Sequence, residues 1–315
     1  MIWILAMITN QCNLKCKLCN IWREKNKELD TAQLYKVLLD VINNDSKISC
    51  LGVTGGEPFL KPKKLEIIFK LIKPELDRSN IKHFNVTTNG SFPLRISSFL
   101  KKIPRNYHSK ISINLSLDGL AKTHNYLRGE KIFKKVILAL NILKKFSIDT
   151  TINFVINPFN SNQIFNVYKL SLKMKADFEL EIFNPDVKSY YHYFDKVTIE
   201  KGNQNWRWQA AGEIGKILAE NEDNFSRKQL LVLKNYLKSE ELNKKIISGC
   251  KTPSNLLFIR ATGEVYSCPH ESAIDRIENF RYQNFLKKQK KMILKIKNKG
   301  CKGCLSTMGA LSYVG

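Results

Sequence analysis

The sequence contains no apolar run long enough to cross a membrane and no recognisable export signal. Its most apolar stretch, MIWILAMIT at residues 1–9, is far shorter than the roughly 20 residues that a membrane-spanning helix needs. It also lacks the basic residues that begin a secretory signal. We therefore interpret it as a buried first strand and expect a cytoplasmic protein without a membrane partner. In that reducing compartment cysteines more often bind metal than form disulfides.

Acidic residues are scarce: 28 Asp and Glu stand against 52 Lys and Arg, which gives a formal net charge of +24. This excess is compatible with nucleic acid as a partner. However, Lys, Asn and Ile are abundant along the whole chain, and the densest basic run, residues 287–299, alternates Lys with apolar residues at helical spacing. That run lacks the interleaved aromatic residues that stack on RNA bases. We expect a solvated helix face there and no nucleic-acid partner.

Short β-branched runs alternate with amphipathic stretches up to about residue 183. This alternation predicts an α/β protein with repeated βα units, a parallel sheet and right-handed crossovers. Six such units fall short of the eight that close a TIM barrel, so we predict a partial (β/α)6 barrel, with a doubly wound sheet as the alternative. The predicted strands are Ile2–Thr9, Ile48–Thr54, His83–Thr88, Lys110–Leu117, Asp149–Val155 and Phe178–Phe183. The predicted helices are Thr31–Asn43, Lys63–Ile72, Arg95–Lys102, Phe133–Phe146 and Gln163–Lys173.

The composition changes twice after the predicted barrel at residues 1–183. Residues 184–248 contain two Trp, several Tyr and polar helical stretches, which predicts a helical bridge or insertion. Residues 249–315 hold four cysteines, a short strand pair around residues 261–264 and the basic helix. A segment this small buries little apolar surface, so we expect a metal site to stabilise it.

Three cysteines follow the first predicted strand, in CNLKCKLC at residues 12–19. Functional groups gather at the carboxyl ends of parallel strands. A disulfide uses two thiols and a structural zinc site four ligands, whereas three thiolates can bind a [4Fe–4S] cluster and leave one iron open to a small molecule. A zinc site completed by a distant ligand is the alternative.

The next three predicted strands also end in residues suited to ligand binding. They are followed by GVTGGEPFL at residues 52–60, VTTNG at 86–90 and SLDG at 116–119. The two glycines of GGEP lack side chains, so a ligand can approach their backbone. Glu57 offers a carboxylate to a cationic group, and Pro58 stiffens the turn.

Together, the cysteine triplet and the GGEP turn at residues 55–58 resemble the radical S-adenosylmethionine (SAM) superfamily. The resemblance implies that Cys12, Cys16 and Cys19 ligate a [4Fe–4S] cluster whose open iron binds the amino and carboxylate groups of SAM. It implies that the reduced cluster, supplied with electrons by an external flavodoxin- or ferredoxin-type carrier, cleaves SAM to a 5′-deoxyadenosyl radical. The backbone of Gly55 and Gly56, together with the Glu57 carboxylate, would then hold the SAM amino group.

SLDG and the following HNYLRG, residues 124–129, are similar to the subfamily that has a C-terminal auxiliary-cluster domain. The resemblance assigns Ser116 and Arg128 to the SAM carboxylate, and a planar guanidinium suits a bidentate pair with a carboxylate. Asn89 is expected to line the same site. Leu18 departs from the family, which usually places an aromatic residue against the adenine at this position, although leucine can still pack on the base.

The four cysteines of the tail make a full four-thiolate set around the ATGEVYSC hairpin; they are Cys250, Cys268, Cys301 and Cys304. Spacing alone does not distinguish zinc from a [4Fe–4S] cluster there. The resemblance to the shortened auxiliary-cluster domain called twitch implies one auxiliary [4Fe–4S] cluster that transfers electrons or supports the fold. Cys50, the eighth cysteine, is expected to pack in the core.

The resemblance implies an enzyme that removes a hydrogen atom from an organic substrate. If the auxiliary cluster accepts a second electron, the net reaction is an oxidation or dehydrogenation, and related twitch enzymes oxidise sugars and aminocyclitols. The first strand is expected from residue 2, which leaves no room for the leader-binding domain of many peptide maturases and favours a small molecule. A peptide-modifying maturase is the alternative, followed by an RNA-modifying enzyme and a cluster carrier without chemistry of its own.

Overall fold

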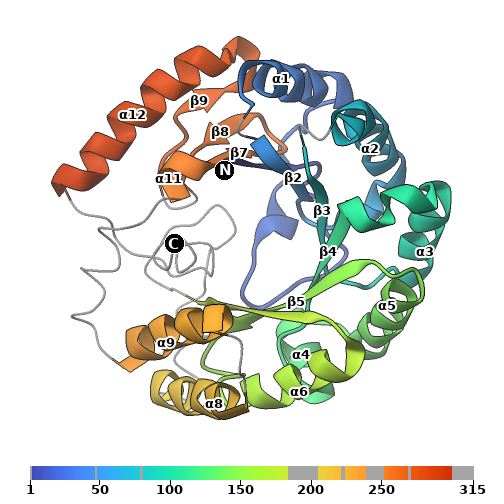
Figure 1. Ribbon diagram of the computed structural model, residues 1–315, viewed down its shortest axis with the longest axis vertical. Helices are drawn as coiled ribbons and strands as arrows, with labels where there is room; N and C mark the ends of the chain where they lie inside the picture. The colour runs from blue at the N-terminus through green and yellow to red at the C-terminus, as the bar shows by residue number, and fades with distance from the viewer. Residues whose placement is uncertain are drawn as a thin grey trace.

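The structure is a computed structural model that describes residues 2–46, 48–78, 81–183, 205–220, 224–238, 252–268 and 271–299. In this part of the chain one curved sheet has the strand order β6-β5-β4-β3-β2-β1-β7-β8-β9, with a layer of helices around its outer side (Figure 1). The strands are β1 (Ile2–Met7), β2 (Ile48–Thr54), β3 (His83–Thr88), β4 (Ile111–Ser116), β5 (Asp149–Ile156), β6 (Asp177–Ile182), β7 (Leu256–Ile259), β8 (Glu264–Tyr266) and β9 (Asp275–Arg276).

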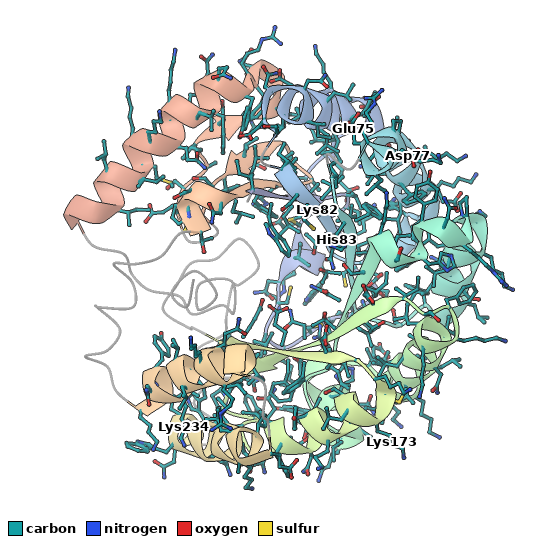
Figure 2. The ribbon with its side chains drawn as sticks, viewed as in Figure 1. Glu75, Asp77, Lys82, His83, Lys173 and Lys234 are labelled. Atoms are coloured by element: carbon teal, nitrogen blue, oxygen red, sulfur yellow. The ribbon has the colours of Figure 1, made fainter. Side chains whose placement is uncertain are left out.

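The first six strands lie in chain order, and each pairs in parallel with the next. A doubly wound sheet would reverse its strand order once, and these six strands do not, so the predicted partial barrel is confirmed. The helices of the outer layer are α1 (Thr31–Asn44), α2 (Pro62–Asp77), α3 (Pro93–Lys102), α5 (Phe133–Lys145) and α6 (Ile164–Met174), and the short helix α4 (Ala121–Arg128) precedes α5 and contacts it. Helix α4, which lies directly before a glycine turn, was not predicted. Labelled residues of α2 and α6, Glu75, Asp77 and Lys173, lie in this layer away from the centre (Figure 2).

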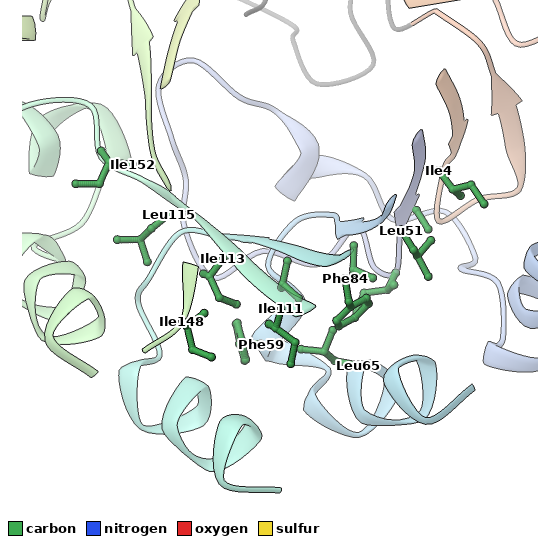
Figure 3. Packing of buried hydrophobic residues seen from close by; sticks show 14 of the residues in the cluster. Ile4, Leu51, Phe59, Leu65, Phe84, Ile111, Ile113, Leu115, Ile148 and Ile152 are labelled. Carbon is green, nitrogen blue, oxygen red and sulfur yellow. The ribbon is translucent and has the colours of Figure 1, made fainter. Parts of the chain in front are cut away.

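Alternation of apolar and polar residues decides which face of each strand meets the helices. In β4, Ile111, Ile113 and Leu115 are buried in the core between sheet and helices (Figure 3), while Ser112 and Asn114 point to the opposite face. Successive strand residues point to opposite faces, and register aligns like faces of neighbouring strands. We call the face opposite the helices the inner face. Its polar residues on β3–β6 include Asn85, Thr87, Ser112, Asn114, Ser116, Thr151, Asn153, Glu179 and Glu181.

Local signals explain where several helices begin and end. The side chains of Asp30 and Gln33 form a reciprocal capping box at the start of α1, and such a box satisfies backbone N–H groups that lack helical partners. Proline occupies the first position of α2 and α3, where its missing N–H costs nothing. Helix α4 ends at Gly129, whose φ of 72° is the left-handed conformation that glycine adopts without strain. This last turn positions Arg128 at the edge of the sheet.

The later part of the chain packs on the barrel. Helices α8 (Trp206–Glu220) and α9 (Asn224–Lys238) pack against each other, and α8 also packs on α6. Strand β7 pairs in parallel with β1, and β8 and β9 follow antiparallel, so the described tail strands continue the barrel sheet. Helix α11 (Thr252–Asn255) precedes β7, and α12 (Tyr282–Lys299), which contains the predicted basic helix, packs on α1. The domain boundaries at residues 183 and 248 stay predictions.

No helix among the described residues is both long and apolar enough to cross a membrane. Of the tail cysteines, Cys250, Cys301 and Cys304 lie outside the described residues. Cys268 lies just after β8 and is buried. Cys50, on β2, has the buried position that was predicted.

Candidate active site at the carboxyl edge of the sheet

The cysteine triplet lies in the loop that joins β1 to the short 3-10 helix η1 (Ile21–Arg23). All three thiols are half-buried, and none forms a disulfide. The loop is fastened to the end of α4, because Lys17 N donates to Leu127 O at 2.8 Å. A side chain on Gly129 would come within 2.7 Å of Lys15 O, so α4 and the loop touch through their backbones. The tertiary contact with α4 therefore holds this loop at the sheet edge.

Nitrogen donors are directed at the cysteine sulfurs. Leu14 N lies 3.5 Å and Asn89 Nδ2 3.8 Å from Cys12 Sγ. Arg128 forms a side-chain hydrogen bond with Cys16. Hydrogen bonds to ligating sulfurs are one means by which proteins set the properties of iron–sulfur clusters. Asn89, predicted to line the site, is thereby placed against the first cysteine.

Without a bound cation these thiols are hard to ionise. Burial raises the pKa of Cys12 to about 12 and that of Cys19 to about 11. A metal cluster supplies the positive charge that makes thiolates stable there. Among the described residues no three His, Cys, Asp or Glu side chains converge as they would around one metal ion. A four-iron cube binds each thiolate at a different iron, so three thiols spaced along one loop fit such a cube.

The glycine turn after β2 packs directly on the segment that leads into the triplet. Gly56 N donates to Thr9 O at 2.8 Å and Glu57 N to Gln11 O at 2.9 Å. A Cβ on Gly55 would lie 2.4 Å from Thr9 O, and one on Gly56 would lie 2.2 Å from Gln11 O. Gly55 also has a φ of 150°, which residues with a side chain rarely adopt. Both glycines are thus required by backbone contact, whatever ligand approaches them.

Glu57 is fully buried and is held by three donors from neighbouring loops. Its Oε1 accepts from Phe59 N at 2.9 Å and from Thr88 Oγ1 at 2.8 Å, and its Oε2 accepts from Asn89 N at 2.8 Å. Burial raises its pKa to about 7, although these hydrogen bonds act in the opposite direction. The carboxylate therefore joins the ends of β2 and β3. Pro58 begins the following 3-10 helix, η2 (Pro58–Leu60), as its fixed φ favours.

Arg128 and Asp118 form a largely buried ion pair beside the cysteine loop. Arg128 Nη2 lies 2.7 Å from Asp118 Oδ2, and the two side chains are 16% and 9% exposed. Burial alone would lower the pKa of Arg128, but Asp118 and Cys16 outweigh it and raise that pKa. Arg128 Nε is buried and has no hydrogen-bond partner among the described residues. The guanidinium therefore has at least this donor available to a ligand.

Asp118 and His124 are residues that the sequence motifs contain but that were not assigned a role. Asp118 Oδ1 accepts from Val155 N at 3.1 Å, and Asp118 N donates to His124 Nδ1 at 3.1 Å. His124 is fully buried, and burial together with Arg128 lowers its pKa to about 3. The ring is therefore neutral and carries its proton on Nε2. The spacing of Asp118 and His124 to Arg128 in SLDG and HNYLRG is the signal that could have identified them.

The inner face continues from Arg128 to the last two barrel strands. Asn153 of β5 lies next to Ser116 on β4 and next to Glu179 on β6. Burial is the main cause that raises the pKa of Glu181 to about 7, and the negative charges of Glu179 and Asp118 act in the same direction. Asn153 hydrogen-bonds to Glu181, but its own Oδ1 has no partner among the described residues. Apart from Ser116, this inner face was not predicted as part of the site.

The remaining predicted residues take positions consistent with a common site. Ser116 ends β4 on the inner face and is half-buried, and Leu18 is half-buried in the cysteine loop. The structure brings the triplet, the glycine turn, Asn89 and Arg128 together through the contacts above. It does not describe three of the four predicted auxiliary ligands.

Comparison with known proteins agrees with this geometry. Residues 7–170 match a family model described as the Radical SAM superfamily. The uncharacterized protein MJ0907 of Methanocaldococcus jannaschii is 22% identical over 303 residues, which span 95% of this chain and 93% of that protein. A probable GTP 3′,8-cyclase of Sulfurisphaera tokodaii is 25% identical over 272 residues, or 83% of this chain and 79% of the cyclase. The solved structure of anSMEcpe with bound AdoMet and Cp18Cys peptide superimposes with a TM-score of 0.69 at 19% identity, over 96% of this chain and 86% of that one, which shows a shared fold.

Proposed function

Because this chain belongs to the radical SAM superfamily, we propose that it binds a [4Fe–4S] cluster through Cys12, Cys16 and Cys19 and removes a hydrogen atom from an organic substrate. Bound cluster and SAM supply the chemistry, a one-electron cleavage of SAM that yields a 5′-deoxyadenosyl radical. The residues of this chain bind and orient both groups. We place the enzyme in the cytoplasm, as the reducing compartment suits its thiolate ligands.

The observation that carries the proposal is the unpartnered Nε of Arg128. Its guanidinium is held by Asp118 at 2.7 Å and lies against Cys16, yet a buried N–H is left without an acceptor in the described structure. Leaving a buried donor unsatisfied costs about 1–3 kcal/mol. The SAM carboxylate is the acceptor that fits, because a guanidinium pairs with it through parallel hydrogen bonds. The half-buried Ser116 lies on the same inner face and offers a hydroxyl to the same group.

The turn after β2 holds the amino end of SAM in this proposal. A carboxylate can accept about four hydrogen bonds, and Glu57 uses three of these for Phe59, Thr88 and Asn89. One acceptor position of Glu57 and the backbone of the glycine turn are therefore left for the amino group. Leu18, in the cysteine loop, supplies apolar contact for the adenine.

The polar inner face supports a hydroxylated small molecule as substrate. Amide and hydroxyl side chains line β4 and β5, and two carboxylates, Glu179 and Glu181, follow on β6. Such groups suit the hydroxyls and amines of a sugar or an aminocyclitol, and the proposed reaction is an oxidation. One auxiliary [4Fe–4S] cluster, bound by Cys250, Cys268, Cys301 and Cys304, would accept the second electron. A peptide substrate is the second candidate, since anSMEcpe, which shares this fold, was solved with a bound peptide.

The test is SAM cleavage by anaerobically reconstituted protein with dithionite as reductant. We expect 5′-deoxyadenosine, and about eight irons per chain if both clusters form. A panel of aminocyclitols and sugars, compared with short peptides, should raise its yield or give an oxidised product. Protein that binds iron but forms no 5′-deoxyadenosine would overturn the proposal.

A further inference from the structure

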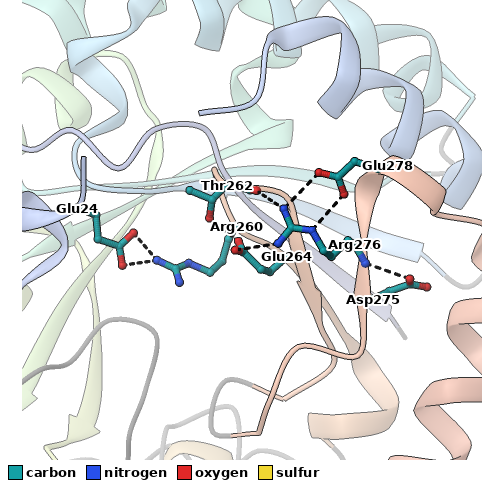
Figure 4. Close-up of polar contacts among 7 residues, drawn as sticks. All are labelled: Glu24, Arg260, Thr262, Glu264, Asp275, Arg276 and Glu278. Carbon is teal, nitrogen blue, oxygen red and sulfur yellow. Dashed lines mark hydrogen bonds and ion pairs between the residues drawn. The ribbon is translucent and has the colours of Figure 1, made fainter. Parts of the chain in front are cut away.

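In the segment that carries the cysteines, residues 12–28, the basic side chains are exposed to solvent and the acidic side chains pair with other residues of the protein. Its basic residues are Lys15, Lys17, Arg23, Lys25 and Lys27, and every one of them is exposed. Its acidic residues are engaged elsewhere. Glu24 pairs with Arg260 of the β7–β8 hairpin (Figure 4), and Glu28 Oε1 accepts from Thr9 Oγ1 at 2.8 Å and Asn10 N at 2.7 Å. The outward side of this segment is therefore purely cationic.

Aromatic rings hold three of these cations in place. Lys15 Nζ lies 5.8 Å and the Arg23 guanidinium 4.8 Å from the centre of the Trp22 ring. Lys17 Nζ lies 4.5 Å from the centre of the Tyr126 ring. A cation over an aromatic face is worth about 0.5–1 kcal/mol at an exposed site. These three charges are thus biased toward the positions over the rings, on a loop whose backbone is fastened to α4.

Trp22 also connects this surface to the proposed cluster. Its Nε1 donates to the carbonyl oxygen of Cys19 at 2.9 Å, so a single hydrogen bond separates a half-buried surface ring from a ligating residue. The radical chemistry proposed above needs one electron for each SAM cleaved. That electron has to enter from a donor bound close to the cysteine loop.

We propose that Lys15, Lys17, Trp22, Arg23, Lys25 and Lys27, which we call the basic loop face, dock a small acidic protein that carries a single low-potential electron. The inference rests on the proposed function, since it requires a cluster at the triplet. One electron leaves the reduced cofactor of the carrier and reduces the cluster by one unit, and no bond forms or breaks in this step. The electron enters at Trp22 and passes through its hydrogen bond to Cys19.

Charge complementarity is the physical basis of this docking. A compact cationic patch steers an acidic partner and can raise association rates by factors of about 10 to 1,000 at low salt. Redox partners form small, transient interfaces of less than about 1,200 Å², so a docking face need not extend far beyond these thirteen residues of one loop. The basic helix α12 has more lysines, but it packs on α1 at the other side of the tail strands and carries no proposed ligand. It provides a matched control for bulk charge.

The experiment compares two charge-reversed proteins that change net charge equally. The docking variant carries Arg23→Glu, Lys25→Glu and Lys27→Glu, and the control carries the exposed α12 substitutions Lys287→Glu, Lys290→Glu and Lys291→Glu. Formation of 5′-deoxyadenosine is measured with reduced flavodoxin and, separately, with dithionite. We expect the flavodoxin-to-dithionite rate ratio to fall about tenfold or more in the docking variant and to stay unchanged in the control. High salt should remove the difference.

A binding measurement separates this inference from the proposed function. The Kd for oxidised flavodoxin, measured on reconstituted protein without SAM, should rise at least about tenfold in the docking variant only. An equal loss of flavodoxin affinity in both variants would show that overall charge and not the basic loop face determines binding, and it would overturn the inference. An unchanged rate ratio and unchanged Kd, or tight binding of tRNA in place of flavodoxin, would overturn it as well. Failure of wild-type protein to cleave SAM with dithionite would instead reject the proposed function.

Discussion

Two halves of the carboxyl edge of the sheet differ in how fully their polar groups are satisfied. The cysteine half comprises the loops after β1, β2 and β3, and there Glu57 accepts from three donors while the glycine turn makes two backbone hydrogen bonds to the segment before the triplet. The arginine half comprises the loop after β4, helix α4 and the inner face of β5 and β6. Its buried atoms Arg128 Nε, His124 Nε2 and Asn153 Oδ1 have no partner among the described residues.

The difference indicates that the two halves have different roles in ligand binding. The cysteine half is a rigid cradle: hydrogen bonds between its loops already fix their conformation before a ligand binds. The arginine half has hydrogen-bonding capacity left over, and ligand groups can use it. Asn10 is the exception in the cysteine half, since neither side-chain polar atom of this buried residue has a partner in the described structure. We therefore expect changes in the cysteine half to destroy the site and changes in the arginine half to weaken binding.

The largest expected effect is that of Cys16→Ala. Loss of one of three thiolates should abolish SAM cleavage and remove the iron of the SAM-binding cluster, which is about four irons per chain. Iron content and 5′-deoxyadenosine are the measurements. Cys50→Ala is the matched control, because Cys50 is buried on β2 away from the loop and should leave both quantities intact. Equal behaviour of the two variants would assign the cluster to other ligands.

A second strong effect should come from Gly56→Ala. The new Cβ would lie 2.2 Å from Gln11 O, so the turn or the cysteine loop has to move. We expect a loss of about 1–3 kcal/mol in unfolding free energy together with poor cluster assembly. Gly212→Ala, in helix α8, adds a carbon that meets no other described element within 4 Å, and it should instead stabilise the protein by about 0.5–1 kcal/mol. Denaturant unfolding separates the two, and a tolerated Gly56→Ala would refute the rigid cradle.

An intermediate effect is expected for Arg128→Gln. In the proposed complex Arg128 pairs with the SAM carboxylate, and removing one member of a buried charge pair across a binding interface costs about 2–5 kcal/mol. The Kd for SAM should therefore rise about 30-fold or more. Iron content should be retained, because Arg128 is not a ligand. Arg276→Gln, which removes a half-exposed arginine paired with Glu264 and Glu278, should leave the Kd unchanged. Titration of SAM into reconstituted protein, followed by electron paramagnetic resonance, gives these values; wild-type affinity in Arg128→Gln would exclude it from the SAM site.

The smallest effect concerns pH and Glu181. Its pKa is raised from 4.5 to about 7 in the folded protein without ligands. The stability that this protonated carboxyl contributes is complete below the unfolded pKa and is lost as pH rises through about 7. Relative to wild type, Glu181→Gln should therefore gain about 2 kcal/mol between about pH 5 and about pH 8, at 1.36 kcal/mol per pKa unit. Urea midpoints at both pH values measure the gain. Glu278→Gln, at an exposed carboxyl whose pKa is lowered by its hydrogen bond to Arg276, should show no such gain.

The motifs made the family predictable from the sequence, and the alternation of strand-like and helix-like runs made the barrel predictable. The alternation of β-branched and amphipathic runs predicted all six barrel strands to within a residue or two at their ends. The triplet and GGEP predicted the radical SAM superfamily, which the family match confirms. Helix α4 was missed because its eight residues, AKTHNYLR, are mostly polar and lack a clear apolar period. The auxiliary cluster, its reductant and the substrate stay predictions.

The sequence by itself determined the chemistry that this chain can hold, because three thiols, two glycines and an arginine are readable as ligand types wherever they lie. Only the tertiary structure decided how they are used. It showed that Gly55 and Gly56 are required by the backbone of Thr9 and Gln11. It also showed that three hydrogen bonds from neighbouring residues already hold the Glu57 carboxylate. It also brought Asp118 near enough to Glu181 to raise the pKa of that carboxyl. The physical reason is that hydrogen-bond saturation and burial depend on contacts between loops far apart in the chain, and residue spacing along one strand or turn carries no information on them.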